Sequence, residues 1–208
     1  MLDVCDPRVI RALLEKYGFH FSKAKGQNFL TQRWVPQRIA QEAGIDRSTG
    51  VLEIGPGIGP LTAELAQRAG KVVAVELDRA LLPVLAETMA PYPNVEVVPG
   101  DVLKLDLTAI AAEKFEGLTP IVCANLPYYI TSPIVMKLLG DRLPIESLTV
   151  MVQKEAADRL AAAPGTRASS AISCAVSYYA TSKMMFTAAP GSFYPAPKVT
   201  SAVVRMEI

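Results

Sequence analysis

The chain is poor in the residues that build metal sites and disulfide frameworks. Its only histidine is His20, and its three cysteines, which show no CxxC spacing, are Cys5, Cys123 and Cys174. A histidine cluster is therefore excluded, and widely separated cysteines are typical of free thiols in a reducing compartment. We predict neither a metal ligand set nor a disulfide framework.

The chain also lacks long apolar segments and an excess of charge of one sign. No apolar run approaches the ~20 residues that a membrane span needs, and the early charges of Asp3, Asp6 and Arg8 argue against a signal peptide. Lys and Arg number 21 and Asp and Glu number 20, which neither requires nor excludes nucleic acid, because a basic face can lie within a neutral total. We expect a cytoplasmic protein without a membrane partner, and we take a monomer as the default state.

What the chain does contain is the pattern of an α/β domain. Half of its 208 residues are hydrophobic and its mean hydropathy is +0.26, which permits a sizeable core and disfavours disorder. Continuous apolar runs predict strands, and the stretches between them have helical patterns. The predicted strands are 51–55, 71–76, 94–98, 120–125, 147–153, 181–188 and 199–207, and the predicted helices are 60–69, 78–89, 132–139, 154–163 and 168–179.

This alternation predicts a doubly wound, mostly parallel sheet of seven strands with helices on both faces. The connection between 181–188 and 199–207 is too short for a crossover helix, so we expect these last strands to be antiparallel.

The first 45 residues precede the core strands and predict an N-terminal helical cap, residues 1–45, within the domain. Asp6 is a suitable N-cap for a helix over 6–18, and a second helix covers 33–43. No linker separates this segment from the rest, so we predict a single domain over residues 1–208.

A glycine-rich turn, Glu53-Ile54-Gly55-Pro56-Gly57-Ile58-Gly59, joins the first core strand to the next helix. Glycines in such a turn let the backbone approach a ligand closely. The following strand ends at Glu76, about 20 residues further on, where a carboxylate can accept hydrogen bonds from both hydroxyls of a ribose. These features fit NAD and S-adenosylmethionine equally. A solvated strand end before a helix cap at Asp78 is the alternative for Glu76.

A third carboxylate follows the next strand. Asp101 can accept a hydrogen bond from an adenine amino group, with Val102 lying on the ring, although a turn aspartate is the alternative. Because open α/β sheets bind ligands beyond the carboxyl ends of their strands, Glu53, Glu76 and Asp101 are expected to share one site. Their negative charge favours a sulfonium cation and disfavours a pyrophosphate, and no Walker lysine follows the glycines. The predicted cofactor is S-adenosylmethionine.

The tetrapeptide Asn125-Leu126-Pro127-Tyr128 ends an apolar run and is the most informative motif of the chain. The Asn125 amide oxygen and the Leu126 carbonyl could accept both hydrogens of an exocyclic amine, which favours pyramidalisation of its nitrogen and stabilises the positive charge that develops. Pro127 has no N–H and restricts Leu126, and the Tyr128 ring could stack on a base. The motif predicts methyl transfer to an amino group on a planar heterocycle, although an ordinary strand-to-helix turn is the alternative.

Phe193 lies in a loop that two nearby prolines stiffen, Pro195 and Pro197. It could form the opposite wall of a slot for the base, although simple loop packing is the alternative. A base held in this way must be unstacked or flipped out of its helix.

On these residues the chain resembles the ribosomal RNA adenine dimethyltransferase family, and most closely its bacterial small-subunit branch. The similarity runs from about Lys23 to Met206, and six ordered blocks carry it. The blocks are Gly26-Gln27-Asn28-Phe29-Leu30, Glu53 to Gly59 followed by Leu61-Thr62, Gly100-Asp101-Val102-Leu103-Lys104, Asn125-Leu126-Pro127-Tyr128-Tyr129-Ile130, Met151-Val152-Gln153-Lys154-Glu155, and Phe193-x-Pro195-x-Pro197-Lys198-Val199-x-Ser201.

The resemblance implies an α/β, Rossmann-like class I fold that uses S-adenosylmethionine. It implies transfer of two methyl groups to each of two adjacent adenosines in a hairpin near the 3′ end of small-subunit (16S) ribosomal RNA, with a role in ribosome biogenesis on the 30S pre-ribosomal particle. Members usually continue for several dozen residues as a small helical C-terminal domain, which we expect to be absent from this chain.

The resemblance also implies roles for individual residues. Asn28 and Leu30 frame the methionine end of the cofactor, and Tyr128 and Phe193 sandwich the target base. The implied cofactor-binding residues are Gln27, Asn28, Leu30, Gly55, Gly57, Glu76, Leu77, Asp101, Val102 and Asn125, and the implied catalytic residues are Asn125, Leu126, Pro127, Tyr128 and Phe193.

Basic residues flank the predicted site on both sides and are candidates for contacts with RNA phosphates, which set affinity and its salt dependence. A solvated surface is the alternative for each of them, and Lys154 can instead pair with Glu155 or Asp158. The candidates are Lys23, Lys25, Arg33, Lys154, Arg159 and Lys198.

Two other functions remain open. The chain could be a ribosome-assembly or RNA-binding factor in which catalysis is secondary. It could also methylate adenine in large-subunit ribosomal RNA, as the antibiotic-resistance methyltransferases of the same fold do.

Overall fold

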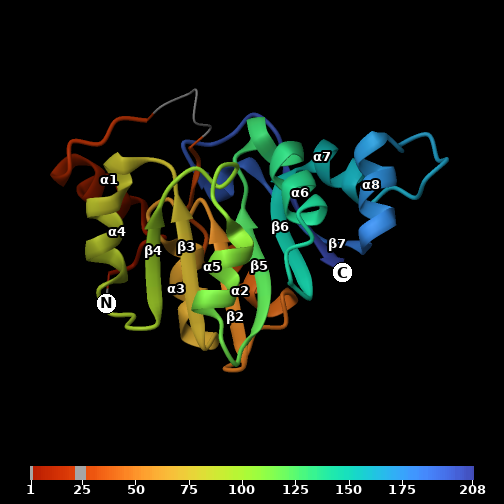
Figure 1. Ribbon diagram of the computed structural model, residues 1–208. Helices are drawn as coiled ribbons and strands as arrows, with labels where there is room; N and C mark the ends of the chain where they lie inside the picture. Colours follow the sequence, from red (N-terminus) through yellow and green to blue (C-terminus); the bar gives the residue numbers. More distant parts are fainter. Residues whose placement is uncertain (1, 22–26) are drawn as a thin grey trace.

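The computed structural model describes residues 2–21 and 27–208. Its centre is a seven-stranded sheet with the order β4-β3-β2-β5-β6-β9-β7 (Figure 1). The first five of these strands are parallel to one another, whereas β9 is antiparallel to both β6 and β7. In sheet order the strands are β4 (Val95–Pro99), β3 (Lys71–Glu76), β2 (Thr49–Ile54), β5 (Thr119–Asn125), β6 (Ser147–Gln153), β9 (Ser201–Glu207) and β7 (Thr181–Ala188).

Helices pack on both faces of this sheet. The helices are α1 (Pro7–Lys16), α2 (Trp34–Glu42), α3 (Pro60–Arg68), α4 (Leu82–Met89), α5 (Leu107–Lys114), α6 (Thr131–Gly140), α7 (Lys154–Leu160) and α8 (Ala171–Tyr179). One core lies between the sheet and α5, α6, α7 and α8, and a second lies between the opposite face and α2 and α3. The predicted fold class, including the antiparallel C-terminal strand, is confirmed.

Alternation along the strands explains the two cores. Leu52 and Ile54 of β2 face the first core, whereas Val51 between them faces the second. Successive side chains of a strand point to opposite faces, so a strand covered on both sides must be apolar throughout. This is why the core strands could be located from continuous apolar runs.

A third, smaller core joins α1 to the β4 edge of the molecule. Ile10, Leu13 and Leu14 of α1 pack against Leu81 and Val84, and α1 and α4 lie side by side at that edge (Figure 1). The predicted N-cap is confirmed, because the Asp6 side chain accepts a hydrogen bond from the backbone N–H of Arg8. α2 packs in the same layer as α3.

A two-stranded ribbon that was not predicted from the sequence lies at the carboxyl edge of the central sheet. β1 (Phe29–Leu30) pairs with β8 (Phe193–Tyr194), which places Leu30 opposite Phe193. Pairs of short strands need other contacts for their stability. Here the rings of Phe21, Phe29 and Tyr194 supply them, since the Phe21 centroid lies 5.5 Å from that of Phe29 and 5.5 Å from that of Tyr194.

The helix α5 was also absent from the prediction. It buries only Leu107 and Ala111, so its apolar stripe is weak. Its start is nevertheless encoded, since the Asp106 side chain accepts a hydrogen bond from the Ala109 backbone N–H at 2.9 Å.

Asp106→Ala is expected to lower the free energy of unfolding by about 1 kcal/mol, because one backbone N–H of the first turn loses its partner. Asp106→Asn keeps an oxygen at the same place and should be close to neutral. Urea denaturation of both variants measures the difference, and equal losses in the two would show that this cap does not stabilise α5.

Candidate functional site

The glycine turn after β2 bends the chain sharply at the carboxyl edge of the sheet. Gly55, Gly57 and Gly59 have φ of 68°, 65° and 93°, a region that other residues rarely adopt. A Cβ on Gly57 would lie 3.1 Å from the Phe29 ring. The turn thus holds the start of α3 and the β1 segment close to the strand ends.

A cavity opens beside this turn, at the carboxyl ends of β2, β3 and β5. The sequence-predicted residues Gln27, Asn28, Leu30, Gly55, Gly57, Glu76, Leu77, Asp101, Val102, Asn125, Leu126, Pro127 and Tyr128 all line it, together with Glu53. Parallel strands in register bring their ends to one edge, which is where ligands bind in open α/β sheets.

Glu76 is held at the end of β3 by the backbone. One of its carboxylate oxygens accepts from the Gly57 N–H at 3.1 Å, and the other accepts from the Asp78 N–H at 2.7 Å. Burial raises the pKa of Glu76, and these N–H groups act in the opposite direction. Each carboxylate oxygen can accept a second hydrogen bond, so the group retains capacity for a ligand hydroxyl.

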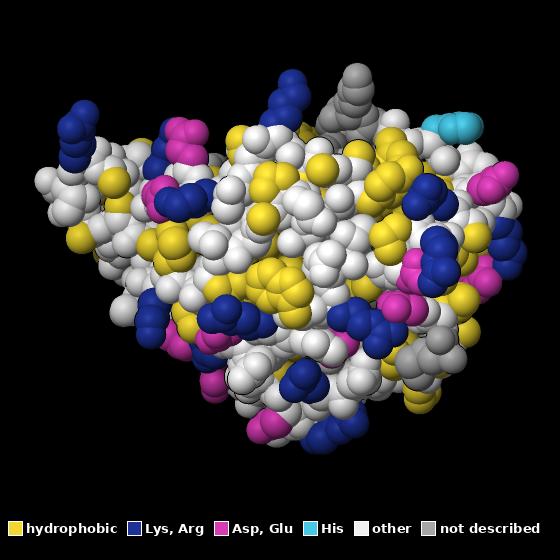
Figure 2. Space-filling view, turned by 180° about the vertical axis from the view of Figure 1, so that it is seen from behind, with side chains coloured by type: hydrophobic (Ala, Val, Ile, Leu, Met, Phe, Trp, Pro, Cys, Tyr) yellow, Lys and Arg dark blue, Asp and Glu magenta, His cyan; other side chains and the backbone are white. Residues whose placement is uncertain are grey.

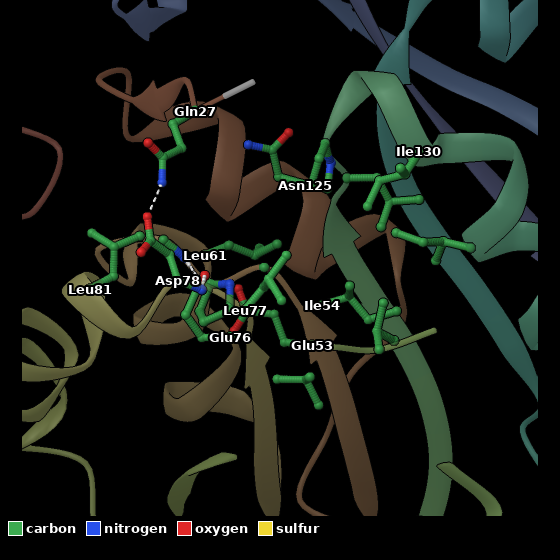
Figure 3. A pocket seen from close by; sticks show the side chains of 18 of the residues that line it. Gln27, Glu53, Ile54, Leu61, Glu76, Leu77, Asp78, Leu81, Asn125 and Ile130 are labelled. Atoms are coloured by element: carbon green, nitrogen blue, oxygen red, sulfur yellow. Dashed lines mark hydrogen bonds between the residues drawn. The ribbon is translucent and has the colours of Figure 1, made fainter. Parts of the chain in front are cut away.

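Asp78 and Gln27 form a link that sequence reasoning missed. The Gln27 amide donates to Asp78 at 2.7 Å (Figure 3). Asp78 also accepts from the Ala80 backbone N–H at 3.2 Å, as the predicted helix cap. The contact ties the segment before β1 to the residue after β3, and no local pattern in the sequence signals it.

Asp101 is a turn aspartate that also lies at the cavity. One carboxylate oxygen accepts from the Leu103 N–H at 3.0 Å, as a turn aspartate does, and the other lies 3.7 Å from the Lys104 ammonium. The residue still lines the cavity beside Val102, which is buried.

The Asn125-Leu126-Pro127-Tyr128 segment leaves β5 and enters the 3-10 turn η3 (Tyr128–Ile130). The Leu126 N–H donates to the Met151 carbonyl at 3.0 Å. Among the residues that the structure describes, neither the Asn125 amide nor the Leu126 carbonyl has a hydrogen-bond partner. In Figure 3 the Asn125 amide lies above the carboxyl groups of Glu53 and Glu76. The predicted pair of acceptors is therefore available at the cavity.

Tyr128 is anchored by a residue whose role the sequence did not suggest. Its hydroxyl lies 2.6 Å from the Ser201 hydroxyl, at the start of β9. Ser201 is fully buried, and burial raises the pKa of Tyr128. Ser201 belongs to the last block of the resemblance, but its separation from Tyr128 along the chain hides the contact.

Phe193 does not line the cavity. It is buried in the core under α2 and lies opposite Leu30 in the β1–β8 ribbon. The cavity wall on this side is Leu30 itself. The role of Phe193 at the base slot stays a prediction.

The candidate phosphate contacts are mostly engaged with acidic neighbours. Arg33 pairs with Asp3 at 2.7 Å, Lys154 pairs with Asp158 at 2.8 Å, and Arg159 pairs with Glu155. Lys198 is exposed and forms no ion pair within residues 2–21 and 27–208. Lys23 and Lys25 lie outside the described residues.

Residues 18–208 match the family described as "Ribosomal RNA adenine dimethylase". The chain belongs to the ribosomal RNA adenine dimethylase family. Its predicted family and its fold are thus confirmed.

Members of this family include proteins very similar to the chain. A protein named "Ribosomal RNA small subunit methyltransferase A" from Geobacillus sp. is 50% identical over 205 residues, with 98% of this chain and 70% of that protein covered. One of the same name from Alkaliphilus oremlandii is 47% identical, with 99% and 71% covered.

Two solved structures of adenine dimethylase relatives share the fold. A dimethyladenosine transferase from Plasmodium falciparum aligns with a TM-score of 0.74 and 30% identity, over 86% of this chain and 62% of that one. The 23S rRNA methyltransferase ErmE aligns with a TM-score of 0.72 and 33% identity, over 86% and 69%.

The adenine dimethylase cavity fits S-adenosylmethionine better than a dinucleotide. Four carboxylates border it, from Glu53, Glu76, Asp78 and Asp101, and no Lys or Arg is among the described residues that line it. A pyrophosphate would meet acidic groups and no cationic side chain there, whereas a sulfonium cation would meet groups of opposite charge. This family and its fold neighbours use S-adenosylmethionine, as the sequence predicted.

Tyr128→Phe and Ser201→Ala are each expected to lower the free energy of unfolding by about 1 kcal/mol, because each removes one buried hydrogen bond. The double variant should lose less than the sum of the two, since both changes remove the same bond. Urea denaturation of the four proteins tests this coupling. Strictly additive losses would mean that the two hydroxyls do not stabilise each other.

Proposed function

We propose that this chain transfers two methyl groups from S-adenosylmethionine to the N6 amino group of each of two adjacent adenosines in small-subunit ribosomal RNA. The target is a hairpin near the 3′ end of that RNA. The observation that carries the proposal is the pair of available acceptors at Asn125 and Leu126, which share one cavity with Glu76 and Asp101.

Methyl transfer to an amino group needs no strong general acid or base, but it needs the amino nitrogen to be held in line with the methyl group. An adenine amino nitrogen is a poor nucleophile, because its lone pair is delocalised into the ring. The Asn125 oxygen and the Leu126 carbonyl accept its two hydrogens, so the nitrogen pyramidalises and its developing positive charge is stabilised. The proton that leaves afterwards can pass to water.

The cofactor would be held by residues of the same cavity. S-adenosylmethionine supplies an electrophilic methyl group on a positively charged sulfur. Glu76 accepts hydrogen bonds from the ribose, Asp101 accepts one from the adenine, and Gln27, Asn28, Leu30, Gly55, Gly57, Leu77 and Val102 complete the contacts. Asn125 reaches both the cofactor and the target amine.

Tyr128 covers the target base. Stacking on an aromatic ring is worth roughly 1–3 kcal/mol per base. The hydrogen bond to Ser201 fixes the ring against β9, so the stacking surface is in place before RNA arrives. Phe193 would reach the base only if the β1–β8 ribbon turns it outward.

On the face that Figure 2 shows, contacts with RNA phosphates would come from scattered cations. Figure 2 shows Lys and Arg side chains interspersed with acidic ones over one face of the molecule. The exposed i,i+4 pair of Lys154 with Asp158 is weak and can be exchanged for a phosphate. Lys198 is already free of acidic partners among the described residues. RNA shape and splayed bases would therefore contribute much of the recognition.

The small subunit is the favoured source of the substrate RNA. The relatives that are 47–50% identical carry small-subunit names, whereas the 23S enzyme is 33% identical. A large-subunit substrate is the second candidate, since that enzyme shares the fold. An assembly factor with secondary catalysis is less well supported, because the cofactor cavity is intact.

We place the activity in the cytoplasm, on the 30S pre-ribosomal particle, with the protein as a monomer. Within the described residues no helix has the length and apolar character needed to cross a bilayer. We further propose that residues 1–208 form a single catalytic domain, with residues 1–45 as its helical cap. The curated relatives are longer than this chain, which covers 70–71% of their length.

Asn125→Ala should lower the rate of methyl transfer by a factor of at least ~10², as loss of one positioned acceptor does in other enzymes. Asn125→Asp keeps an oxygen acceptor and should retain more activity than the alanine variant. Both are incubated with unmethylated small subunits and labelled donor, with large subunits in parallel, and the RNA nucleosides are read by mass spectrometry. Full activity of a folded Asn125→Ala protein would refute the role of this residue.

Tyr128→Ala should raise KM for RNA roughly tenfold to a hundredfold, which corresponds to the loss of ~1–3 kcal/mol of stacking. The affinity for S-adenosylmethionine should change far less. Calorimetry with the cofactor and steady-state kinetics with RNA separate the two effects. Equal losses in both would mean that Tyr128 supports the cavity rather than the base.

A further inference from the structure

The Glu53 carboxyl group is buried in the cofactor cavity, and no cationic side chain or backbone N–H among the described residues pairs with it. It ends β2 next to the glycine turn, and the residue is only 1% exposed. Its Oε2 atom has no hydrogen-bond partner among the described residues, and neither has the nearby Thr62 hydroxyl. Burying an ionised carboxylate in this way is costly, and most buried polar groups find a partner.

Glu76 lies in the same cavity, but its carboxylate has hydrogen-bond donors that Glu53 lacks. Two backbone N–H groups donate to Glu76, whereas none donates to Glu53. Figure 3 shows the two residues close together at the floor of the cavity. Backbone N–H groups therefore stabilise the negative charge of Glu76, whereas no group of this kind stabilises an ionised Glu53.

Within residues 2–21 and 27–208, no Lys or Arg side chain pairs with Glu53. The groups that face Glu53 are Glu76 on β3, Thr62 on α3 and Cys123, its register partner on β5. Cys123 is itself fully buried and neutral, because burial raises the pKa of its thiol. The Arg205 guanidinium lies three strands away and bonds the Glu42 carbonyl and the Glu207 carboxylate.

The charge state of Glu53 follows from these surroundings. Burial, with a further contribution from the charge of Glu76, raises the pKa of Glu53 to about 8. The carboxyl is therefore mostly neutral at pH 7 in the ligand-free protein. A positive charge placed in the cavity would favour the ionised form and release the proton.

We propose that Glu53 makes the cavity select the charged methyl donor over its spent product, by giving up its proton when the donor binds and keeping it when the product binds. The inference rests on the cofactor assignment made above and does not depend on the RNA. S-adenosylmethionine carries a positive sulfonium, and loss of the methyl group leaves S-adenosylhomocysteine with a neutral thioether. The proton passes from the Glu53 carboxyl to solvent, and no other bond changes.

Linkage gives this exchange a measurable signature. A ligand that releases one proton binds up to tenfold more tightly for each unit that pH rises, until the carboxyl is already ionised in the free protein. Donor affinity should therefore rise towards pH 8, relative to product affinity. The ligands' own titrations are the same for every variant and cancel when variants are compared.

Isothermal titration calorimetry at pH 7, in two buffers of different ionisation enthalpy, counts the protons released by each ligand. Wild-type protein should release close to one more proton with the donor than with the product. Glu53→Gln should abolish this difference and lower the preference for donor over product about tenfold, the change that linkage assigns to one proton over one pH unit. Thr62→Val, which removes the neighbouring hydroxyl and leaves the carboxyl, should still release the additional proton with the donor, because Thr62 only opposes the rise in the pKa of Glu53 that burial causes.

Infrared difference spectra of the wild type provide a second measurement that does not depend on whether the Gln variant folds. The band of a protonated carboxyl should disappear when the donor is added and persist with the product. Equal proton counts for both ligands, or a Glu53→Gln protein with the wild-type preference, would overturn this inference alone. A chain that binds neither ligand would refute the cofactor assignment as well.

Discussion

The in-register parallel pairing of β2 with β3 and β5 is the constraint on which the site depends. Ile54 lies opposite Val75 on one side and Ala124 on the other, so the residues that follow each strand emerge together. The glycine turn, Glu76 and Asn125 are distant in the sequence but meet at one edge for this reason. The apolar faces of the strands supply the driving force, and the polar chemistry is confined to their ends.

Much of this architecture could be predicted from local patterns. The strands 71–76, 147–153 and 181–188 were predicted with the boundaries that the structure has, because an apolar run forms the middle of each. The helix α5 escaped prediction, since it buries little and its strongest signal is the single cap at Asp106. Periodicity detects what an element buries, and an element that buries little gives a weak signal.

The site could be predicted residue by residue only where a motif lies at a strand end. Contacts between distant segments, such as Tyr128 with Ser201 and Gln27 with Asp78, have no local signature. The surroundings of Phe193 could not be predicted from its motif alone, because they depend on the pairing of β8 with β1. Its pairing opposite Leu30 buries its ring beside the cavity, and its role at the base slot stays a prediction.

The β1–β8 ribbon has a consequence for how the protein is made. Leu30 borders the cavity and pairs with Phe193, more than 160 positions later in the chain. During synthesis from the N-terminus, the parallel strands can assemble while this late partner is still within the ribosome. The wall of the cofactor cavity at Leu30 is therefore completed only when translation of these 208 residues is nearly finished.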